Sequence, residues 1–193
     1  MNKMDIDWRK IVAKYQVADT WRSIWQIVNT VIPYLALWAI MFWSLSVSYW
    51  LTLLISIPTA GFMVRTFIIF HDCGHGSFFK SRRANLIVGI VTGILTYTPW
   101  HSWWHDHNIH HASAGNLDKR GIGDVDTWTV EEYLAAPRWK QLWYRFMRHP
   151  LVMFTIGAMV VFAVVKRFPL PSHSKREKAS IWWTNLALFV IIS

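Results

Sequence analysis

Five of the nine histidines in this 193-residue chain lie in two short segments, at spacings that suit metal binding. His71 and His75 are four residues apart. In the second segment, His107 and His111 are again four apart, and His110 adjoins them. Residues at i and i+4 lie on one face of a helix, so each segment can present two or three imidazoles to one metal centre. Imidazole is a common ligand of iron, zinc and copper.

The acids beside the two clusters are Asp72 and Asp106, and no glutamate lies near either cluster. A zinc protease of the His-Glu-x-x-His type needs a general-base glutamate between its ligands, so that class is excluded. Haem held by two histidines would leave three of the five without a role. Hydrogen bonding to lipid headgroups explains one or two histidines rather than five. We therefore predict a metal site formed by His71, His75, His107, His110 and His111.

The remaining four histidines are not predicted to bind the metal. His101 and His105 are four residues apart, but His105 lies about 200° from His107 on a continuous helix, nearly opposite the predicted ligand face. We interpret these two as supporting or surface groups. His149 and His173 flank apolar runs and are interpreted as interfacial.

Other polar and aromatic residues near the clusters receive separate interpretations. Cys73, the only cysteine, excludes an internal disulfide and is predicted to pack on the side away from the first histidine pair. Carboxylates often orient metal-bound imidazoles, a role predicted for Asp72, Asp106 and Asp124. Three tryptophans beside the second cluster are interpreted as membrane-belt residues, with the wall of an apolar substrate slot as the alternative: Trp100, Trp103 and Trp104.

The composition predicts that these histidines lie in a membrane protein. Hydrophobic residues make up 53% of the chain and charged residues 16%, against roughly 25% charged in soluble domains. The fourteen tryptophans suit membrane interfaces. The net charge is +9, but the basic residues flank apolar runs, so we expect membrane lipids as partners and no nucleic acid.

A charge-free stretch of 42 residues between Arg22 and Arg65 predicts a membrane hairpin. As a helix it would be about 63 Å long, enough for two crossings of a core about 30 Å thick. We expect crossings near 27–46 and 50–69, with a turn at the serines between them. Arg65 is close enough to the membrane face to extend its charge to it.

The amino-terminal segment 1–26 is predicted to be a cytoplasmic tail. Its basic residues favour the cytoplasm by the positive-inside rule, and they are Lys3, Arg9, Lys10, Lys14 and Arg22. Both ends of the hairpin then lie on that side, and His71 emerges at the cytoplasmic face.

The segment 84–100 is charge-free for 17 residues, the low end of what can span a membrane. Ile87, Ile90 and Val91 belong to an apolar stripe at helical spacing, while Gly89 and Thr92 lie on the other side. We predict an interfacial or shallow re-entrant helix, because a crossing here would place the two histidine clusters on opposite sides.

The rest of the chain is predicted to form a polar cap and an incomplete second hairpin. Residues 116–149 are polar, and Thr129 to Glu132 resembles a helix capping box. The run 151–165 is expected to cross the membrane, although five basic residues in the loop 166–178 conflict with an outward position. The run 181–192 is too short to span. The fold class is thus an all-α membrane protein, with residues 27–193 as its membrane domain.

Four segments together resemble the membrane fatty acid desaturases, over about residue 30 to the end. They are His-Asp-Cys-Gly-His-Gly-Ser-Phe-Phe at 71–79, His-x-x-His-His-Ala at 107–112, Gly-Asn-Leu-Asp at 115–118, and Gly-Asp-Val followed by Thr-Val-Glu-Glu-Tyr within 123–133. They are most similar to the bacterial acyl-lipid branch, of the omega-6 (delta-12) type. The superfamily also includes carotenoid ketolases and alkane hydroxylases, whose first boxes look less like this one.

The resemblance implies a non-haem di-iron centre that uses O2 as co-substrate to insert a double bond into an acyl chain. It also implies an acyl-lipid or other acyl-chain substrate and a ferredoxin- or cytochrome-type electron donor. By the same resemblance, His71 and His75 match the first histidine box of the family, and His107, His110 and His111 match the second. His101 and His105 fall outside both boxes.

One departure from the family bears on activity. Family members carry a third box of the His-x-x-His-His type, and nothing after His111 matches it. Five histidines cannot supply four or more ligands to each of two irons, so we expect an inactive amino-terminal part of a desaturase. The alternatives are a related membrane hydroxylase or ketolase, and a non-enzymatic histidine-rich membrane protein that binds metal.

Overall fold

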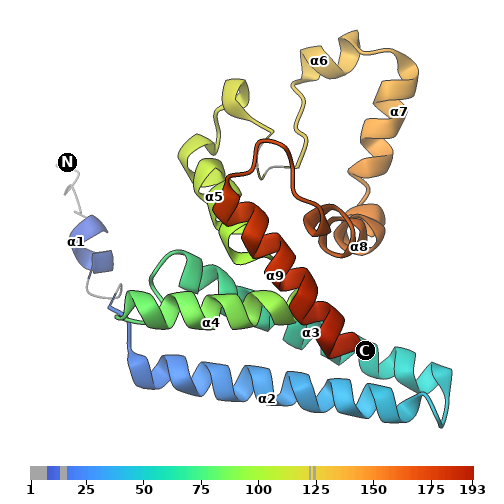
Figure 1. The fold of residues 1–193 in the computed structure, drawn as a ribbon. Coiled ribbons are helices and arrows are strands. Elements are labelled where there is room, and N and C mark those ends of the chain that lie inside the picture. The colour runs from blue at the N-terminus through green and yellow to red at the C-terminus, as the bar shows by residue number, and fades with distance from the viewer. Residues whose placement is uncertain (1–7, 14–16, 122, 124) are drawn as a thin grey trace, which may run out of the picture. The chain divides into compact units, whose positions relative to one another are not determined.

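The computed structural model describes residues 8–13, 17–121, 123 and 125–193, and among these it contains helices and no strand. The all-α fold class is therefore confirmed. The chain divides into two compact units, Met1–Thr96 and Tyr97–Ser193, which are described one at a time (Figure 1). Three residues used in the sequence interpretation lie outside the described part: Lys3, Lys14 and Asp124.

The first unit is built on an antiparallel helical hairpin, preceded by the short α1 (Trp8–Ala13). The hairpin pairs α2 (Thr20–Ser44) with α3 (Tyr49–Gly74), and both helices are long and apolar enough to cross a membrane. The Asp19 carboxylate caps α2 by accepting from the backbone N–H groups of Trp21 and Arg22. The predicted helical hairpin and its serine-rich turn are confirmed, its crossing of a membrane stays a prediction, and the predicted division at 26/27 falls within α2.

Small polar residues line the buried side of α3 at a seven-residue interval. Thr52, Thr59 and Thr66 are followed by Cys73, and all four are buried. Each threonine hydroxyl donates to a backbone carbonyl four residues earlier, at 2.8–3.2 Å, so none requires water. Small residues let helices approach closely in a membrane, where apolar side chains gain nothing by turning inward. Cys73 packs in this row, as predicted.

A polar contact joins the two long helices at the level of Arg65. Its guanidinium donates to the Asn29 side-chain oxygen at 3.0 Å and lies 5.4 Å from the centre of the Phe62 ring. The charged Arg65 side chain of α3 is therefore hydrogen-bonded to a side-chain amide of α2 within the hairpin.

Helix α4 (Arg82–Leu95) packs against α3 with its small residues, not with its apolar stripe. Gly89 and Thr92 are buried, whereas Ile87 and Val91 are more than half exposed. This orientation suits a helix whose outer face meets lipid, because the small side chains permit close packing on the protein side. At 14 residues the helix is shorter than the candidate spans, and that it does not cross the membrane stays a prediction.

The second unit begins with α5 (Trp100–Ser113), which packs against the last helix, α9 (Lys175–Ile192). Between them lie the short η1 (Leu117–Lys119), α6 (Val130–Ala135) and α7 (Arg138–Met147). The predicted capping box is present at α6, where Thr129 and Glu132 cap each other's backbone. Ser174 and Glu177 form a second capping box at α9.

The third apolar run is broken and not one straight helix. It comprises the π-helical η2 (Val152–Gly157), α8 (Ala158–Ala163) and the 3₁₀ turn η3 (Val165–Arg167). This run and α7 are long and apolar enough to cross a membrane only when they are taken together, and the chain bends by 68° between them. The Arg167 guanidinium donates to the Tyr97 carbonyl and, at 3.1 Å, to the Asn185 side-chain oxygen, and thus joins this run to the segment before α5 and to α9.

Candidate metal centre

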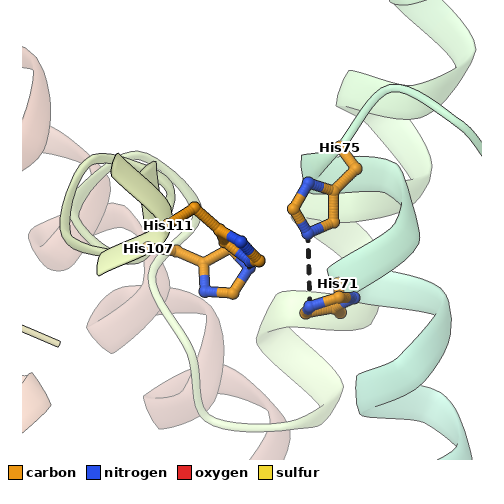
Figure 2. Close-up of side chains that lie close together, drawn as sticks. All are labelled: His71, His75, His107 and His111. Atoms are coloured by element: carbon orange, nitrogen blue, oxygen red, sulfur yellow. Dashed lines mark hydrogen bonds between the residues drawn. The ribbon is translucent and has the colours of Figure 1, made fainter. Parts of the chain in front are cut away.

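The first histidine pair lies at the carboxyl end of α3. His71 is in its last turn and His75 caps it, and Gly76 then ends the helix with a φ of 68°. The two Nε2 atoms are 3.3 Å apart, and the rings meet edge to face with centroids 4.5 Å apart (Figure 2). A helix carboxyl terminus carries partial negative charge, which favours a bound cation there.

Asp72 orients the first imidazole. Its Oδ1 atom lies 3.2 Å from Nδ1 of His71, so the ring can donate its Nδ1 proton to the carboxylate and keep the Nε2 lone pair for a metal. The Asp72 carbonyl in turn accepts from the backbone N–H and the hydroxyl of Ser77, both at 3.1 Å. The contact predicted for Asp72 is therefore present.

The second pair lies on α5. The Nε2 atoms of His107 and His111 are 3.1 Å apart, and their rings are nearly perpendicular with centroids 4.5 Å apart (Figure 2). Trp103, one turn earlier, stacks on the His107 ring at 4.2 Å and an interplanar angle of 18°. This contact limits the rotation of the imidazole about its side-chain bonds.

The belt interpretation is wrong for two of the three tryptophans. Trp100 and Trp103 are buried, at 8% and 9% exposure, and only Trp104 is exposed. Because Trp100 and Trp103 are among the buried residues of α5, these two rings serve the packing of the helix and, for Trp103, the support of His107. The spacing of four between Trp103 and His107 is a sequence signal that could have revealed this stack.

His110 stands apart from the close nitrogen pair on its own helix. Its ring centroid is 6.1 Å from that of His107 and 5.6 Å from that of His111. The backbone of Gly123 runs over this flank, where an added Cβ would come within 3.0 Å of the Asp106 carbonyl oxygen and 3.2 Å of the His110 Cβ. The ligand role of His110 stays a prediction.

Asp106 does not orient an imidazole through the contact that the structure shows for it. Its carboxylate is paired with Lys166, at 2.7 Å, and both side chains are more than three-quarters buried. A contact across sixty positions leaves no trace in local spacing, so the sequence alone indicates only a role in membrane topology for Lys166.

The other four histidines belong to neither pair. The His101 backbone donates to the Ser180 hydroxyl at 3.1 Å, and burial, followed by the charge of Arg176, lowers the pKa of its ring. His105 and His149 are exposed. The His173 ring accepts from the Leu170 backbone at 3.2 Å. None of the four joins a close imidazole pair among the described residues, and that they do not bind the metal stays a prediction.

The separations within each pair fit two ligands of one ion. Nitrogens that each lie about 2.1 Å from a metal are about 2.9–3.4 Å apart in octahedral or tetrahedral geometry. The observed 3.3 and 3.1 Å fall within this range. Each pair therefore suits a borderline cation such as iron or zinc, with no change in side-chain conformation.

Comparison with known proteins identifies the family of the chain. The family model for fatty acid desaturases matches residues 48–193, which include both histidine clusters and most of the chain. The chain belongs to the fatty acid desaturase family. No solved structure matches it significantly.

Three curated relatives illustrate the similarity of this desaturase-family chain. It is 46% identical to a fatty acid desaturase of Bacillus subtilis, over 94% of the chain and 52% of that protein. It is 31% identical to an sn-1 oleoyl-lipid 12-desaturase of Synechocystis, over 64% of the chain and 34% of that protein. A 44% identical match to a Synechocystis sn-1 acyl-lipid omega-3 desaturase (ferredoxin) covers 27% of the chain and 14% of that protein. The chain thus spans about half the length, or less, of these relatives, which are oxidoreductases by name.

Proposed function

We propose that this chain carries part of the iron site of a membrane acyl-lipid desaturase. The observation that supports this proposal most directly is a histidine pair on each of α3 and α5. The Nε2 atoms are 3.3 Å apart in the first pair and 3.1 Å apart in the second. In this proposal each pair supplies ligands to iron, and His110 completes the set on α5. Family membership supports iron over zinc.

The site is proposed to lie at the cytoplasmic face. If α2 and α3 both cross, the amino terminus of α2 and the carboxyl terminus of α3 are on the same side, with the first histidine pair. Basic residues gather next to these ends, namely Arg22, Lys80, Arg82 and Arg83. By the positive-inside rule that side is cytoplasmic.

The residues of the chain hold and orient the metal beside the lipid. Neutral imidazoles would hold the iron, and Asp72, in contact with Nδ1 of His71, would favour one tautomer of that ring and offset part of the added positive charge. Bound iron would supply the activation of dioxygen that an unactivated methylene C–H bond requires. In the overall reaction, a CH2–CH2 unit, O2, two electrons and two protons give a CH=CH unit and two waters.

The number of histidines limits what the chain can do unaided. Two irons with four or more ligands each need at least eight ligand positions, and the two clusters offer five histidines. We therefore propose that the 193-residue chain binds metal weakly and inserts no double bond without further ligands. Metal affinity depends on a complete and pre-organised set of ligands.

The substrate and the electron donor follow from the names of relatives. Oleoyl-lipid and acyl-lipid desaturases are among them, and one name specifies ferredoxin. We propose an acyl chain esterified in a membrane lipid as the substrate and ferredoxin as the reductant. A cytochrome-type donor is the alternative.

A chimera tests the proposal. In the Bacillus subtilis relative, the matching segment, 182 aligned residues at 46% identity, is replaced by this chain. The fatty acids of a host that expresses the chimera are then analysed by gas chromatography and mass spectrometry. New double bonds are expected, and they should disappear with His71→Ala or His107→Ala while His105→Ala retains them.

Analysis of the lipid products and of the bound metal in the same chimera separates the rival functions. Hydroxyl or keto products would assign the chain to the hydroxylase or ketolase branch. A chimera that carries tightly bound zinc and yields no lipid product would favour a non-enzymatic metal-binding protein. Immunoblotting of the membranes confirms that each variant is present in equal amount.

A further inference from the structure

Helix α7 carries an apolar face that nothing in the described chain covers. Trp139, Leu142, Trp143 and Phe146 are 66%, 64%, 59% and 52% exposed. At about 100° per residue, these four fall within an arc of about 100°, the width of a complete apolar stripe. In the sequence analysis this region was interpreted as part of a polar cap, which does not explain four large apolar side chains in a row.

The opposite face of α7 packs against other parts of the chain. Tyr144 stacks on Trp128 at 4.7 Å, and its hydroxyl accepts from the Trp128 backbone at 3.3 Å. Gln141 donates to the Ala136 carbonyl at 2.8 Å. These contacts hold the inner face of α7 against the segment that contains α6, so the rotation of the helix is fixed and its apolar stripe points outward.

The charged residues of α7 indicate the kind of partner that its apolar stripe contacts. The segment from Arg138 to Arg148 contains four basic residues and no acidic residue, and the basic residues are Arg138, Lys140, Arg145 and Arg148. On the helical wheel they flank the apolar arc or lie behind it. Tryptophan and phenylalanine toward the acyl chains, with arginine and lysine at the headgroups, are the pattern of a helix that lies in a membrane interface.

The chain beyond α7 gives independent support. After a break of four residues it bends by 68° into the apolar run Val152–Arg167. Most exposed side chains on that run, such as Phe154 and Met159, are apolar, and Thr155 is the polar exception. A helix in the plane of the interface followed by a segment that enters the hydrocarbon requires a bend of this kind.

We propose that α7 lies flat in the membrane interface and binds anionic phospholipid through its basic edges. A soluble protein partner is a weaker fit, because the apolar arc is continuous along the helix and flanked by charge of one sign only. The proposal is independent of the chemistry of the histidine clusters. It makes α7 an anchor that fixes the cap, from α6 onward, relative to the lipid surface.

Spin labels on the 193-residue chain in lipid nanodiscs test the position of α7. With Cys73 replaced by alanine, single cysteines replace Leu142, Phe146, Arg145 or Glu131, the last on exposed α6 as a control. At Leu142 and Phe146 the label should collide more with oxygen than with a water-soluble nickel chelate, and at Arg145 and Glu131 the order should be reversed. Nickel-accessible labels at Leu142 and Phe146 would overturn the proposal in favour of a soluble partner. Oxygen-dominated collisions at Arg145 would also overturn it, in favour of a bent membrane span.

The lipid preference has its own test. The chain is purified from membranes that contain phosphatidylglycerol and phosphatidylethanolamine, and the retained lipids are quantified by mass spectrometry. Replacing Lys140, Arg145 and Arg148 by glutamine should lower the ratio of anionic to zwitterionic lipid, by up to about fivefold for each charge at the surface. The matched control replaces Lys80, Arg82 and Arg83, which are exposed and lie at α4. An equal or larger loss in the control would contradict the assignment of the lipid site to α7.

Discussion

Lys166 and Asp106 form an ion pair at 2.7 Å that joins the end of the third apolar run to the histidine-bearing helix α5. Asp106 directly precedes His107, so the pair fixes the backbone from which the second histidine pair projects. The five basic residues of the loop 166–178 conflict with an outward position by the positive-inside rule. The ion pair reduces this conflict, because the Lys166 charge is largely buried and paired with Asp106 within the protein.

Replacement of Lys166 by methionine should destabilise the second unit, because the Asp106 carboxylate would lose its partner. For a charged hydrogen bond that retains some exposure, we expect a loss of about 1–2 kcal/mol. Thermal unfolding in detergent measures it, with Lys119→Met as an exposed control. The double variant Lys166→Met/Asp106→Asn should be more stable than Lys166→Met alone. If it is less stable, the two residues do not act as a pair.

Asp72→Asn should weaken metal binding without removing a ligand. The amide cannot accept the Nδ1 proton of His71 as strongly as the carboxylate, so the imidazole becomes less basic and less well oriented. Loss of such a partner typically costs 10–100-fold in metal affinity. Titration with Co2+, followed by visible absorption, provides the measurement, and Asp118→Asn is the control. Equal affinities in the two variants would show that the 3.2 Å contact has no influence on the metal.

A series of histidine-to-alanine variants should rank the ligands. Loss of His71, His75, His107 or His111 is expected to abolish specific Co2+ or Fe2+ binding, while His101→Ala and His105→Ala should retain it. Full metal binding by His107→Ala would refute the proposed site. His110 decides between two forms of the proposal. A loss as large as that of His111→Ala confirms five ligands, and an intermediate loss indicates a supporting role beside Gly123.

Much of this organisation could be predicted from the sequence, because local spacing encodes it. The hairpin follows from a charge-free stretch of the right length, and the i, i+4 spacing of His71 and His75 gives the pair at the end of α3. Two features were not predictable in this way. The small side of α4 packs inward, because the membrane removes the hydrophobic penalty for an outward Ile87 or Val91. The pair of Lys166 and Asp106 depends on tertiary folding alone.

The capping box of α6 should weaken in acid. The pKa of the Glu132 carboxyl is below its ordinary value, first because the Arg120 side chain donates to it and also because the Thr129 backbone does. Its folded pKa is lower than its unfolded pKa, so its contribution to stability is complete above the unfolded value and is lost as the pH falls through the folded value. Hydrogen exchange of the α6 amides should therefore increase at acidic pH, after correction for the intrinsic rate. Glu132→Gln should show the faster exchange already at neutral pH, and a pH response in Glu132→Gln as large as in the parent chain would assign the effect to another group.

Both histidine pairs should be accessible from the cytoplasm only. Ser77 follows the first pair and Ala114 follows the second, and both residues are exposed. Single cysteines at these positions, in a Cys73→Ala background, should react with a membrane-impermeant thiol reagent in inverted vesicles and not in intact cells. A cysteine at Ser46, in the turn between α2 and α3, should show the opposite pattern if the hairpin crosses the membrane. Labelling of Ser77→Cys and Ala114→Cys from opposite sides would separate the two pairs by a bilayer and exclude a shared metal centre.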